Sequence, residues 1–405
     1  MDILEMLKTE SFWKEFIKYK IDGKHLSSYE EKDLKLFIEQ KEYLPILEKI
    51  SNGEPFSLPH IRDINKKHSN KKRRVFVFDR EENYVLKAIA YSLHCYDYAF
   101  PNNLYSFRKN IGVKRAVSDL TKSVLNKPYY GYKVDISDYF NSVDTNDSLL
   151  QLKHVLSNDI KLYNFIHDIL KSPFALLDDN VVTCQKGIMA GAPISGFLAN
   201  LYLVELDRWF EEHNIIYARY SDDIIVFAET EELIAEYEHK IKSFLEDHKL
   251  TINQRKEVRT LPGEAWEFLG FCIAENRIDI SDISLSKMKD KMRRKSHAIV
   301  RWKKRNNVCA ERAVLAFIRH FNRKFFDNPK HHEVTWCRWY FPTITTSKKL
   351  HILDEYMVSC IRYIATGKHS KSNYNLRYEE IKALGYRNLV NSYHYYKKTN
   401  CYKEF

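Results

Sequence analysis

The chain has 405 residues, with 65 Lys or Arg against 54 Asp or Glu, so its formal net charge is +11 and its pI is about 9.0. No apolar run reaches the roughly 20 residues that a membrane-spanning helix needs, and the first residues lack the apolar core of a signal peptide. An excess of cationic side chains favours a polyanionic partner, most often nucleic acid, although a basic protein with no such partner fits the same charge.

The first part of the chain predicts helices up to about residue 60. A short strand at Arg74–Phe78 and an amphipathic helix follow. The segment "YYGYKVDISDYFNSV" then predicts a strand that ends in acidic residues, and residues 146–175 read as helices.

A Gly/Pro turn opens the second half, in "GIMAGAPISGFLANLYLVELDRWFEEH", and apolar periodicity predicts one long helix after it. Two apolar strands, "IIYARY" and "IIVFA", flank Ser221-Asp222-Asp223. A helix at Glu231–His248 and a hairpin-like segment, "WEFLGFCIAENRIDIS", come next. From Leu285 onward the pattern is mostly helical.

Acidic residues interrupt two of the apolar strands. Asp135 stands at the apolar end of "YKVDI", and Asp222 stands at the connection between the two later strands. Turn chemistry alone could explain Asp222 and Ser221. If the strands pair, however, Asp135 and Asp222 converge, and their charges would repel unless a cation joined them. Carboxylates in this arrangement suit Mg²⁺, and two ions about 3.5–4 Å apart could clamp an in-line displacement.

The segment Leu285–Arg305 is densely basic, and Asp290 is its only acidic residue. A solvated helix face would explain it, but so many like charges repel on one helix. The segment therefore favours a partner that neutralises it, and a phosphate backbone is the partner we expect.

The ordered motifs resemble those of reverse transcriptases of the retron and group II intron lineage. "YSDD" (Tyr220–Asp223) is similar to the YxDD box, and "VDISDYF" is similar to the first palm motif. "RRVFVFDREEN" and "LYSFRKNIGVKRAV" resemble two fingers motifs. "AGAPISGFLANLYL", "LTINQRKEVR" and "FLGF" resemble the later ones. The set runs in order over roughly residues 70–280.

The resemblance implies an α+β fold, a right-hand polymerase with fingers at 1–130, an antiparallel-sheet palm at 131–280 that carries inserted fingers helices, and a helical thumb with a C-terminal extension at 281–405. It also implies a catalytic metal site for two Mg²⁺ ions, with these ligands: Asp135, Asp222, Asp223 and the backbone carbonyl of Ile136.

The same resemblance assigns residues that contact the nucleotide. Lys72 and Arg74 would contact the triphosphate, and the backbone amides of Asp138 and Tyr139 would cradle it. Phe140 would lie under the sugar, where its bulk would clash with a 2′-hydroxyl.

Three further assignments follow from motif position. Gly191 belongs to the turn that carries nucleotide and template contacts, and Lys256 would donate a proton to the departing pyrophosphate. The nucleic-acid contacts would come from these residues: Arg108, Lys291, Arg294 and Lys295. One position departs from the family, because Ala190 stands where Gln usually precedes the Gly of the turn. The missing side-chain contact puts nucleotide selection and processivity in question.

The aromatic and basic C-terminal segment "RYEEIKALGYRNLVNSYHYYKK" is most similar to defence-associated reverse transcriptases of the unknown-group class, with type 2 as the candidate subgroup. The implied function is to copy a structured non-coding RNA into cDNA from dNTPs in antiphage defence. The implied partners are that RNA and the cDNA product, with no membrane.

Two other functions remain open. One is template-independent or protein-primed DNA synthesis of the abortive-infection type, and the other is an RNA-binding scaffold without catalysis. Seven scattered cysteines with no CxxC pair favour a reduced, cytoplasmic compartment.

Overall fold

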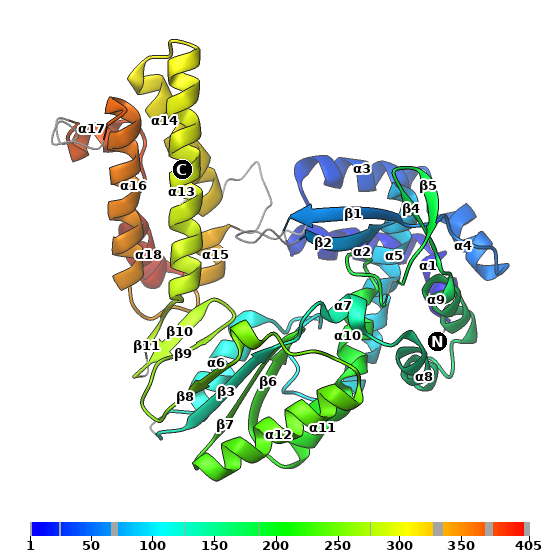
Figure 1. The fold of residues 1–405 in the computed structure, drawn as a ribbon. Helices are drawn as coiled ribbons and strands as arrows, with labels where there is room; N and C mark the ends of the chain where they lie inside the picture. The colour runs from blue at the N-terminus through cyan, green and yellow to red at the C-terminus, as the bar shows by residue number, and fades with distance from the viewer. Residues whose placement is uncertain are drawn as a thin grey trace. The chain divides into compact units, whose positions relative to one another are not determined.

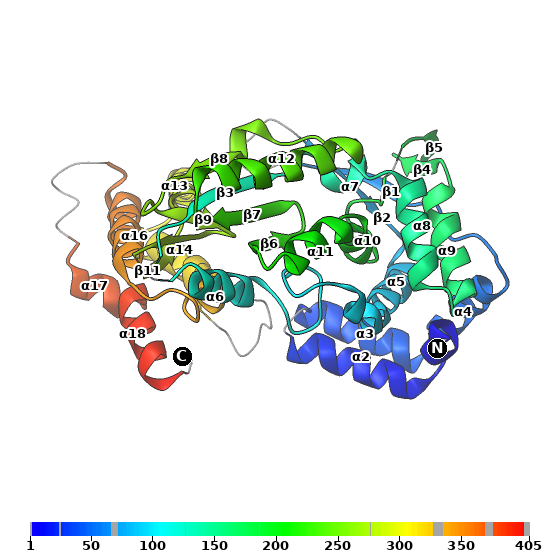
Figure 2. The same cartoon turned by 90° about the horizontal axis from the view of Figure 1, so that it is seen from below.

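A computed structural model describes residues 2–23, 26–65, 72–125, 127–185, 187–275, 277–326, 335–368 and 376–400. The chain separates into two compact units (Figures 1 and 2). The first comprises Met1–Gly23 and Tyr29–Pro262, and the second comprises Gly263–Phe405 with Lys24–Ser28. The predicted subdivision at residues 130 and 280 remains a prediction.

Four helices open the chain, as expected: α1 (Ile3–Leu7), α2 (Glu10–Asp22), α3 (Ser28–Glu39) and α4 (Tyr43–Ser51). Their apolar positions recur at helical spacing and bring aromatic rings together. Trp13 stacks on Tyr43 at 4.7 Å between ring centroids and meets Phe16 and Phe37 edge-on. All four side chains are almost completely buried, so this cluster is the core of the N-terminal helices.

A four-stranded sheet follows, in the order β2-β1-β4-β5. Its strands are β1 (His60–Asn65), β2 (Lys72–Val77), β4 (Phe174–Leu177) and β5 (Asn180–Thr183). Only the contact between β1 and β4 is parallel. The strand predicted at 74–78 is β2, whereas β1 and the β4–β5 hairpin were not predicted. The hairpin begins just after α9, so the prediction of helix over 146–175 fails at its end, where Pro173 follows the last helical turn.

The connecting helices are α5 (Arg80–Ser92), the 3-10 helix η1 (Leu93–Ala99), α6 (Val113–Ser123), α7 (Tyr139–Ser142), α8 (Thr145–Val155) and α9 (Ile160–Lys171). Helix α5 matches the predicted amphipathic helix, with its apolar face buried.

The second sheet carries the acidic residues and has the order β6-β7-β3-β8, antiparallel throughout. Its strands are β3 (Tyr130–Asp135), β6 (Ile216–Tyr220), β7 (Asp223–Ala228) and β8 (Val258–Thr260). Residues Ile224–Ala228 of β7 are all buried, so both faces of this strand are covered. Helix α12 (Glu231–Asp247) packs on β7 and β3. The short 3-10 helix η2 (Gln254–Lys256) lies beside β3.

The predicted long helix is two helices, α10 (Ser195–Tyr202) and α11 (Val204–Glu212), which meet at Leu203. Every residue of α10 is buried and it packs against α8, whereas α11 buries one face against β6. Apolar periodicity continues through both segments, so the sequence did not show that they pack against different neighbours.

The second unit holds a three-stranded antiparallel sheet, in the order β11-β10-β9, where a hairpin was expected. The strands are β9 (Trp266–Phe268), β10 (Phe271–Ala274) and β11 (Arg277–Ile280). The described residues that follow form these helices: α13 (Asp282–Arg305), α14 (Ala310–Phe325), α15 (Trp336–Tyr340), α16 (Lys348–Thr366), α17 (Tyr378–Ala383) and α18 (Leu389–Thr399). Within the described ranges, none of the helices is long and apolar enough to span a bilayer.

Candidate active site

Three carboxylates meet at one end of the second sheet. Asp135 ends β3 and is the cross-strand partner of Asp223, the first residue of β7. Asp222 lies in the turn before it, and its carbonyl accepts a hydrogen bond from the Ile136 amide at 3.0 Å. One carboxylate oxygen from each of Asp135, Asp222 and Asp223 lies within 4.8 Å of the other two. The convergence expected from the sequence is therefore present.

A two-residue turn joins β6 to β7 and places Asp222 at its tip. Tyr220 pairs with Asp223, which leaves Ser221 and Asp222 as the loop. Ser221 has φ +60°, a left-handed conformation that matches the twist of hairpin strands but is costly for a side chain with a Cβ. Its amide donates to Ser106 Oγ at 2.9 Å. The turn is thus held from outside the hairpin.

A buried ion pair between Arg219 and Asp207 stabilises this turn. Arg219 and Asp207 are both 0% exposed, and the guanidinium makes a forked contact, with Nη2 2.5 Å from Oδ2 and Nε 2.8 Å from Oδ1. The remaining guanidinium hydrogens reach backbone carbonyls, including those of Asn200 at 2.9 Å and Ser221 at 3.3 Å. Tyr217 donates its hydroxyl to the same carboxylate at 2.9 Å.

This network was not predicted. An Arg within the apolar strand "YARY" was its only signal, because a cation at an inward-facing strand position requires a buried anion as partner. Asp207 lies on α11, where it resembled an ordinary polar residue of an amphipathic helix.

The electrostatics of the three acids favour a cation. Burial raises the pKa of Asp222, and the neighbouring charge of Asp135 raises it further. Burial likewise raises the pKa of Asp223 to about 6, with Asp222 and Asp135 as the next causes. Carboxylate oxygens at this spacing are the ligands that hard divalent cations take. The residues present therefore fit Mg²⁺.

Asp135 also has two protein partners. Asn253 donates to its Oδ1 at 3.0 Å, and the Lys256 ammonium lies 2.5 Å from its Oδ2. Burial alone would lower the pKa of Lys256, but the hydrogen bond and charge of Asp135, with the other two acids, raise it. Lys256 is therefore a protonated group inside the acidic cluster.

Helix α7 begins four residues after Asp135, and three of the predicted nucleotide contacts, Asp138, Tyr139 and Phe140, lie at its start. Asp138 has φ +48° and precedes the helix. The amides of Tyr139 and Phe140 are in its first turn, where no acceptor within the helix is available. The Tyr139 ring is buried and donates its hydroxyl to the Ala199 carbonyl at 2.6 Å. Phe140 is half-buried.

Strand β2 presents alternate side chains to opposite faces. The Arg73 guanidinium lies 5.7 Å from the centre of the Phe140 ring, and its charge acts on Asp222. Arg74 instead has Asp63 of β1 3.9 Å from its Nε, and Lys72 is exposed. The predicted pair, Lys72 and Arg74, flanks Arg73, which sequence reasoning did not select.

The turn that contains Gly191 packs against β2. The Phe76 amide donates to the Ala190 carbonyl at 2.8 Å. Gly191 has φ +100°, and a Cβ there would stand 3.1 Å from Val75 Cβ and 3.2 Å from the Phe76 carbonyl. Ala190, at the position of the family's Gln, is only 1% exposed.

Arg108 contacts the protein rather than open solvent. Its guanidinium donates to the backbone carbonyls of Pro101, Leu104 and Asp97, at 2.6–3.2 Å. Its predicted contact with nucleic acid stays a prediction.

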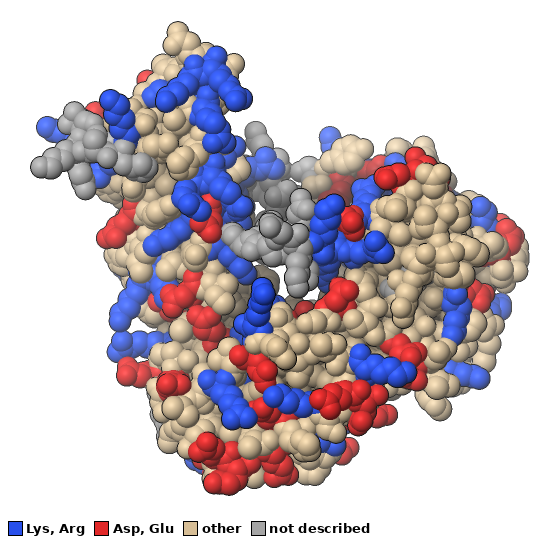
Figure 3. Space-filling view, viewed as in Figure 1, with Lys and Arg blue, Asp and Glu red and all other residues tan. Residues whose placement is uncertain are grey.

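The basic face of α13 is in the second unit. Arg294 is exposed, whereas Lys291 and Lys295 are half-buried. A hollow of about 390 Å³ is lined by Arg293, Arg294, His297 and Arg301. Figure 3 shows Lys and Arg side chains following the helix on this side. Of the predicted set, only Arg294 therefore lines this hollow.

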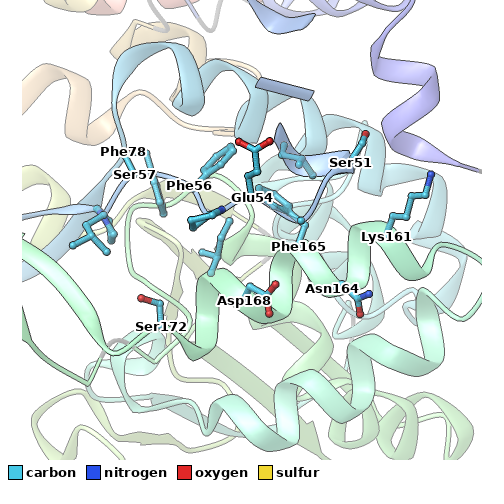
Figure 4. Close-up of a pocket in the computed structure, with 16 residues that line it drawn as sticks. Ser51, Glu54, Phe56, Ser57, Phe78, Lys161, Asn164, Phe165, Asp168 and Ser172 are labelled. Atoms are coloured by element: carbon cyan, nitrogen blue, oxygen red, sulfur yellow. The ribbon is translucent and has the colours of Figure 1, made fainter. Parts of the chain in front are cut away.

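A separate cavity of about 360 Å³ lies between the α4–β1 connection and α9 (Figure 4). Phe56, Phe78 and Phe165 supply its apolar lining, and Lys161 and Asp168 lie at α9. None of the three clustered acids lines it.

The antiparallel sheet with clustered acids, followed by a helical unit, defines the class of protein. The reverse transcriptase (RNA-dependent DNA polymerase) family model matches residues 64–273, just over half of the chain. The chain therefore belongs to the reverse transcriptase family. The predicted α+β polymerase fold, with its antiparallel palm sheet and helical thumb, is confirmed.

Individual relatives are distant. The retron Ec86 reverse transcriptase of Escherichia coli is 25% identical over 173 residues, which cover 39% of this chain and 49% of that protein. This chain thus spans about half the length of that curated relative. The similarity to a retron enzyme agrees with the predicted retron lineage.

Two solved structures are also similar. Apo telomerase from Candida tropicalis is 13% identical, with a TM-score of 0.45 over 81% of this chain and 69% of that one. Telomerase from Candida albicans with a fragment of telomeric RNA is 12% identical, with a TM-score of 0.44 over 86% and 68%.

Proposed function

We propose that this protein is an RNA-directed DNA polymerase that joins deoxynucleotides to a primer by two-metal nucleotidyl transfer. The observation that carries the proposal is the meeting of Asp135, Asp222 and Asp223 inside the region that matches the reverse transcriptase family. In addition to burial, the charge of Asp135 raises the pKa of both Asp222 and Asp223. Carboxylates this close are costly to keep together, so their presence argues against a purely structural role.

The primer 3′-hydroxyl attacks the α-phosphate of the incoming nucleotide, and pyrophosphate leaves. Asp135, Asp222, Asp223 and the Ile136 carbonyl would hold two Mg²⁺ ions, and these ions would supply positive charge for the phosphate oxygens. Lys256, protonated beside Asp135, is the donor for the departing pyrophosphate. Proton transfer of this kind contributes about 10²–10⁴-fold to a rate.

The nucleotide is held from two sides. On one side, Arg73 of β2, whose guanidinium lies by the Phe140 ring, faces the nucleotide, and a forked guanidinium suits phosphate oxygens. Arg74 and Lys72 alternate with Arg73 along the strand, so as proposed triphosphate contacts they would have to reach it from the other face of β2. The backbone amides of Asp138 and Tyr139, at the start of α7, donate hydrogen bonds to the triphosphate from the other side. The Gly191 turn completes this side of the site, and Phe140 lies under the sugar.

The template proposed is a structured non-coding RNA, copied into cDNA in antiphage defence. The support is the basic face of α13, together with the resemblance of the C-terminal sequence to defence-associated enzymes. Arg108, Lys291, Arg294 and Lys295 remain proposed nucleic-acid contacts. A cytoplasmic location is part of the same proposal.

Primer extension with the full-length protein tests the catalytic assignment. Asp222→Ala should lower incorporation by at least about 10³-fold, because a lost metal ligand removes several kcal/mol of charge stabilisation and each 1.4 kcal/mol is tenfold in rate. Asp247→Ala, an exposed acid at the end of α12, is the matched control and should incorporate normally. Equal incorporation by the wild type and Asp222→Ala would remove these acids from the mechanism.

The product sequence separates the alternatives. A product that follows a supplied RNA supports templated synthesis, whereas one unrelated to it supports the template-independent or protein-primed reaction. No incorporation by the wild type under either condition would favour the RNA-binding scaffold. Sequencing of the nucleic acids that co-purify with the protein identifies a bound RNA, its borders and any attached cDNA.

A further inference from the structure

Phe107 has an unusual backbone conformation for an aromatic residue. Its φ is +49°, in the left-handed region that bulky side chains rarely adopt. The side chain is nevertheless 45% exposed, so burial of the ring in the core does not account for the conformation. Strain of this kind persists only where surrounding contacts determine it, and it often marks a functional site.

Both neighbours of Phe107 are anchored. Ser106 Oγ lies 2.9 Å from Asn200 Oδ1, and the Asn200 side-chain amide donates to the Ser106 carbonyl at 2.7 Å. On the other side, the Arg108 guanidinium holds three backbone carbonyls. The amide of Ser221, next to Asp222, donates to Ser106 Oγ as well. These contacts fix the position of Phe107 relative to the catalytic turn.

The anchored backbone places the Phe107 ring against Phe140. The two ring centroids are 6.1 Å apart with an interplanar angle of 90°, the edge-to-face geometry that aromatic pairs favour. Gly196 of α10 leaves the room for this placement, because a Cβ there would stand 2.7 Å from the Cγ and Cδ1 atoms of the Phe107 ring.

The backbone of Phe140 is fixed by a different segment. The Ile188 amide donates to the Phe140 carbonyl at 2.9 Å, and a Cβ on Gly187 would stand 2.3 Å from that oxygen. These contacts hold the main chain but leave the side-chain torsions of Phe140 free to change rotamer. The ring itself lies 5.7 Å from the Tyr139 ring, 5.7 Å from the Arg73 guanidinium and 6.1 Å from the Phe107 ring. Tyr139 is its neighbour in the chain and shares its helix, whereas Phe107 comes from a different segment.

We propose that Phe107 is a specificity-determining positioning residue, whose ring braces Phe140 so that Phe140 excludes the 2′-hydroxyl of a ribonucleotide. The inference rests on the proposed polymerase function and adds a residue to it. A half-buried ring discriminates by collision only if it cannot turn aside, and Phe107 blocks that movement. Phe107 is not one of the clustered acids and its ring packs on Phe140, so its removal acts on sugar choice through Phe140.

The test compares dATP with ATP as substrates in primer extension, as the ratio of their kcat/KM values. Phe107→Ala should lower this preference by about tenfold, toward that of Phe140→Ala, mainly by improving the use of ATP. Phe107→Tyr keeps the ring and should retain the preference. Gly196→Ala displaces the ring and should shift the preference in the same direction as Phe107→Ala.

The matched control is Phe174→Ala on β4, because Phe174 is also 45% exposed and should leave the preference unchanged. A preference in Phe107→Ala equal to that of the wild type, or equal losses with both nucleotides, would overturn the inference. The ratio of dissociation constants for dATP and ATP, measured with Ca²⁺ so that no bond forms, provides a second readout. If the wild type extends no primer, the polymerase proposal fails, and this binding ratio still decides the role of Phe107.

Discussion

At the scale of single residues, the site depends on polar groups that are completely buried. Arg219 is 0% exposed and its charge is matched by Asp207, which in turn accepts from Tyr217. Such a pair adds little net stability compared with apolar residues of the same size, but removing one partner leaves the other charge buried without compensation. Its value here is geometric, because the same guanidinium reaches the Ser221 carbonyl at the catalytic turn.

Asp207→Ala should therefore destabilise the first unit by about 3–5 kcal/mol, the range for one lost partner of a buried pair. Urea denaturation followed by circular dichroism measures the change. The double variant Asp207→Leu with Arg219→Met should recover much of this stability, since no charge is left buried.

The comparison variant is Glu229→Gln, which breaks an exposed pair with Lys127 and should leave the unfolding curve unchanged. A single Asp207→Ala variant as stable as the Glu229→Gln variant would show that Arg219 finds solvent or another anion.

At the scale of elements, the Gly187–Ser195 segment joins three parts of the first unit. Its Ile188 amide donates to the Phe140 carbonyl of α7, and its Ala190 carbonyl accepts from the Phe76 amide of β2. Ser195 Oγ, at the start of α10, lies 2.6 Å from the Ile188 and Met189 carbonyls. The segment contains Gly187 and Gly191, which both have positive φ. A Cβ would stand 2.3 Å from the Phe140 carbonyl oxygen at Gly187 and 3.2 Å from the Phe76 carbonyl oxygen at Gly191, so glycine is needed at both positions. The segment thus sets how β2, α7 and α10 lie around the nucleotide.

Gly187→Ala should lower kcat/KM for dATP by more than about tenfold. Its φ is +53°, and the added Cβ meets the Phe140 carbonyl at 2.3 Å, so α7 or the turn must shift, and small misplacements near a reacting group are costly. Steady-state kinetics checks this, with a thermal melt to confirm folding.

Gly53→Ala separates the steric effect from the backbone effect. Gly53 has φ +72° with no atom within 4 Å of a Cβ placed there, so this variant should lose some stability and keep its kcat/KM. Similar kinetics for the two variants would mean that α7 tolerates the added methyl group.

At the scale of the whole molecule, the net charge is +11, and the cationic side chains have different surroundings in the two units. In the first unit, the charge of Arg73 on β2 acts on Asp222 of the acidic cluster, whereas α13 of the second unit carries a run of bases along one helix. Exposed cations that bind a phosphate backbone release counterions, so their contribution is visible in the salt dependence of binding.

Neutralising Lys291, Arg294 and Lys295 to Gln should weaken RNA binding and reduce the slope of log K against log salt. The reduction expected is about 0.7 per lost phosphate contact for single-stranded RNA. Fluorescence anisotropy at several salt concentrations measures it.

A control with the same change in net charge is Lys32→Gln, Lys35→Gln and Lys49→Gln on α3 and α4, all exposed. It should keep the wild-type slope. Identical slopes for both triple variants would indicate that only net charge matters and that α13 is not a binding surface.

Local sequence patterns predict much of the architecture. Short runs of apolar, strand-forming residues indicated β3, β6 and β7, helical periodicity indicated α5, α12 and α13, and the ordered motifs indicated the family. The missed strands include β1 and the β4–β5 hairpin. The β4–β5 hairpin has four residues per strand, too few for a period of two to stand out from the helices before it.

The sequence by itself determined which residue types are available and in what order: paired acids after apolar strands, a basic strand, a glycine-rich turn and a basic helix. These are properties of neighbouring residues, and the chain's local physics fixes them. Only the tertiary structure decided that Arg73 meets Phe140, that Asp207 neutralises Arg219, and that Phe107 lies against Phe140. Strand pairing, burial and side-chain direction bring these partners together, and no local periodicity records which distant residue will fill a given position.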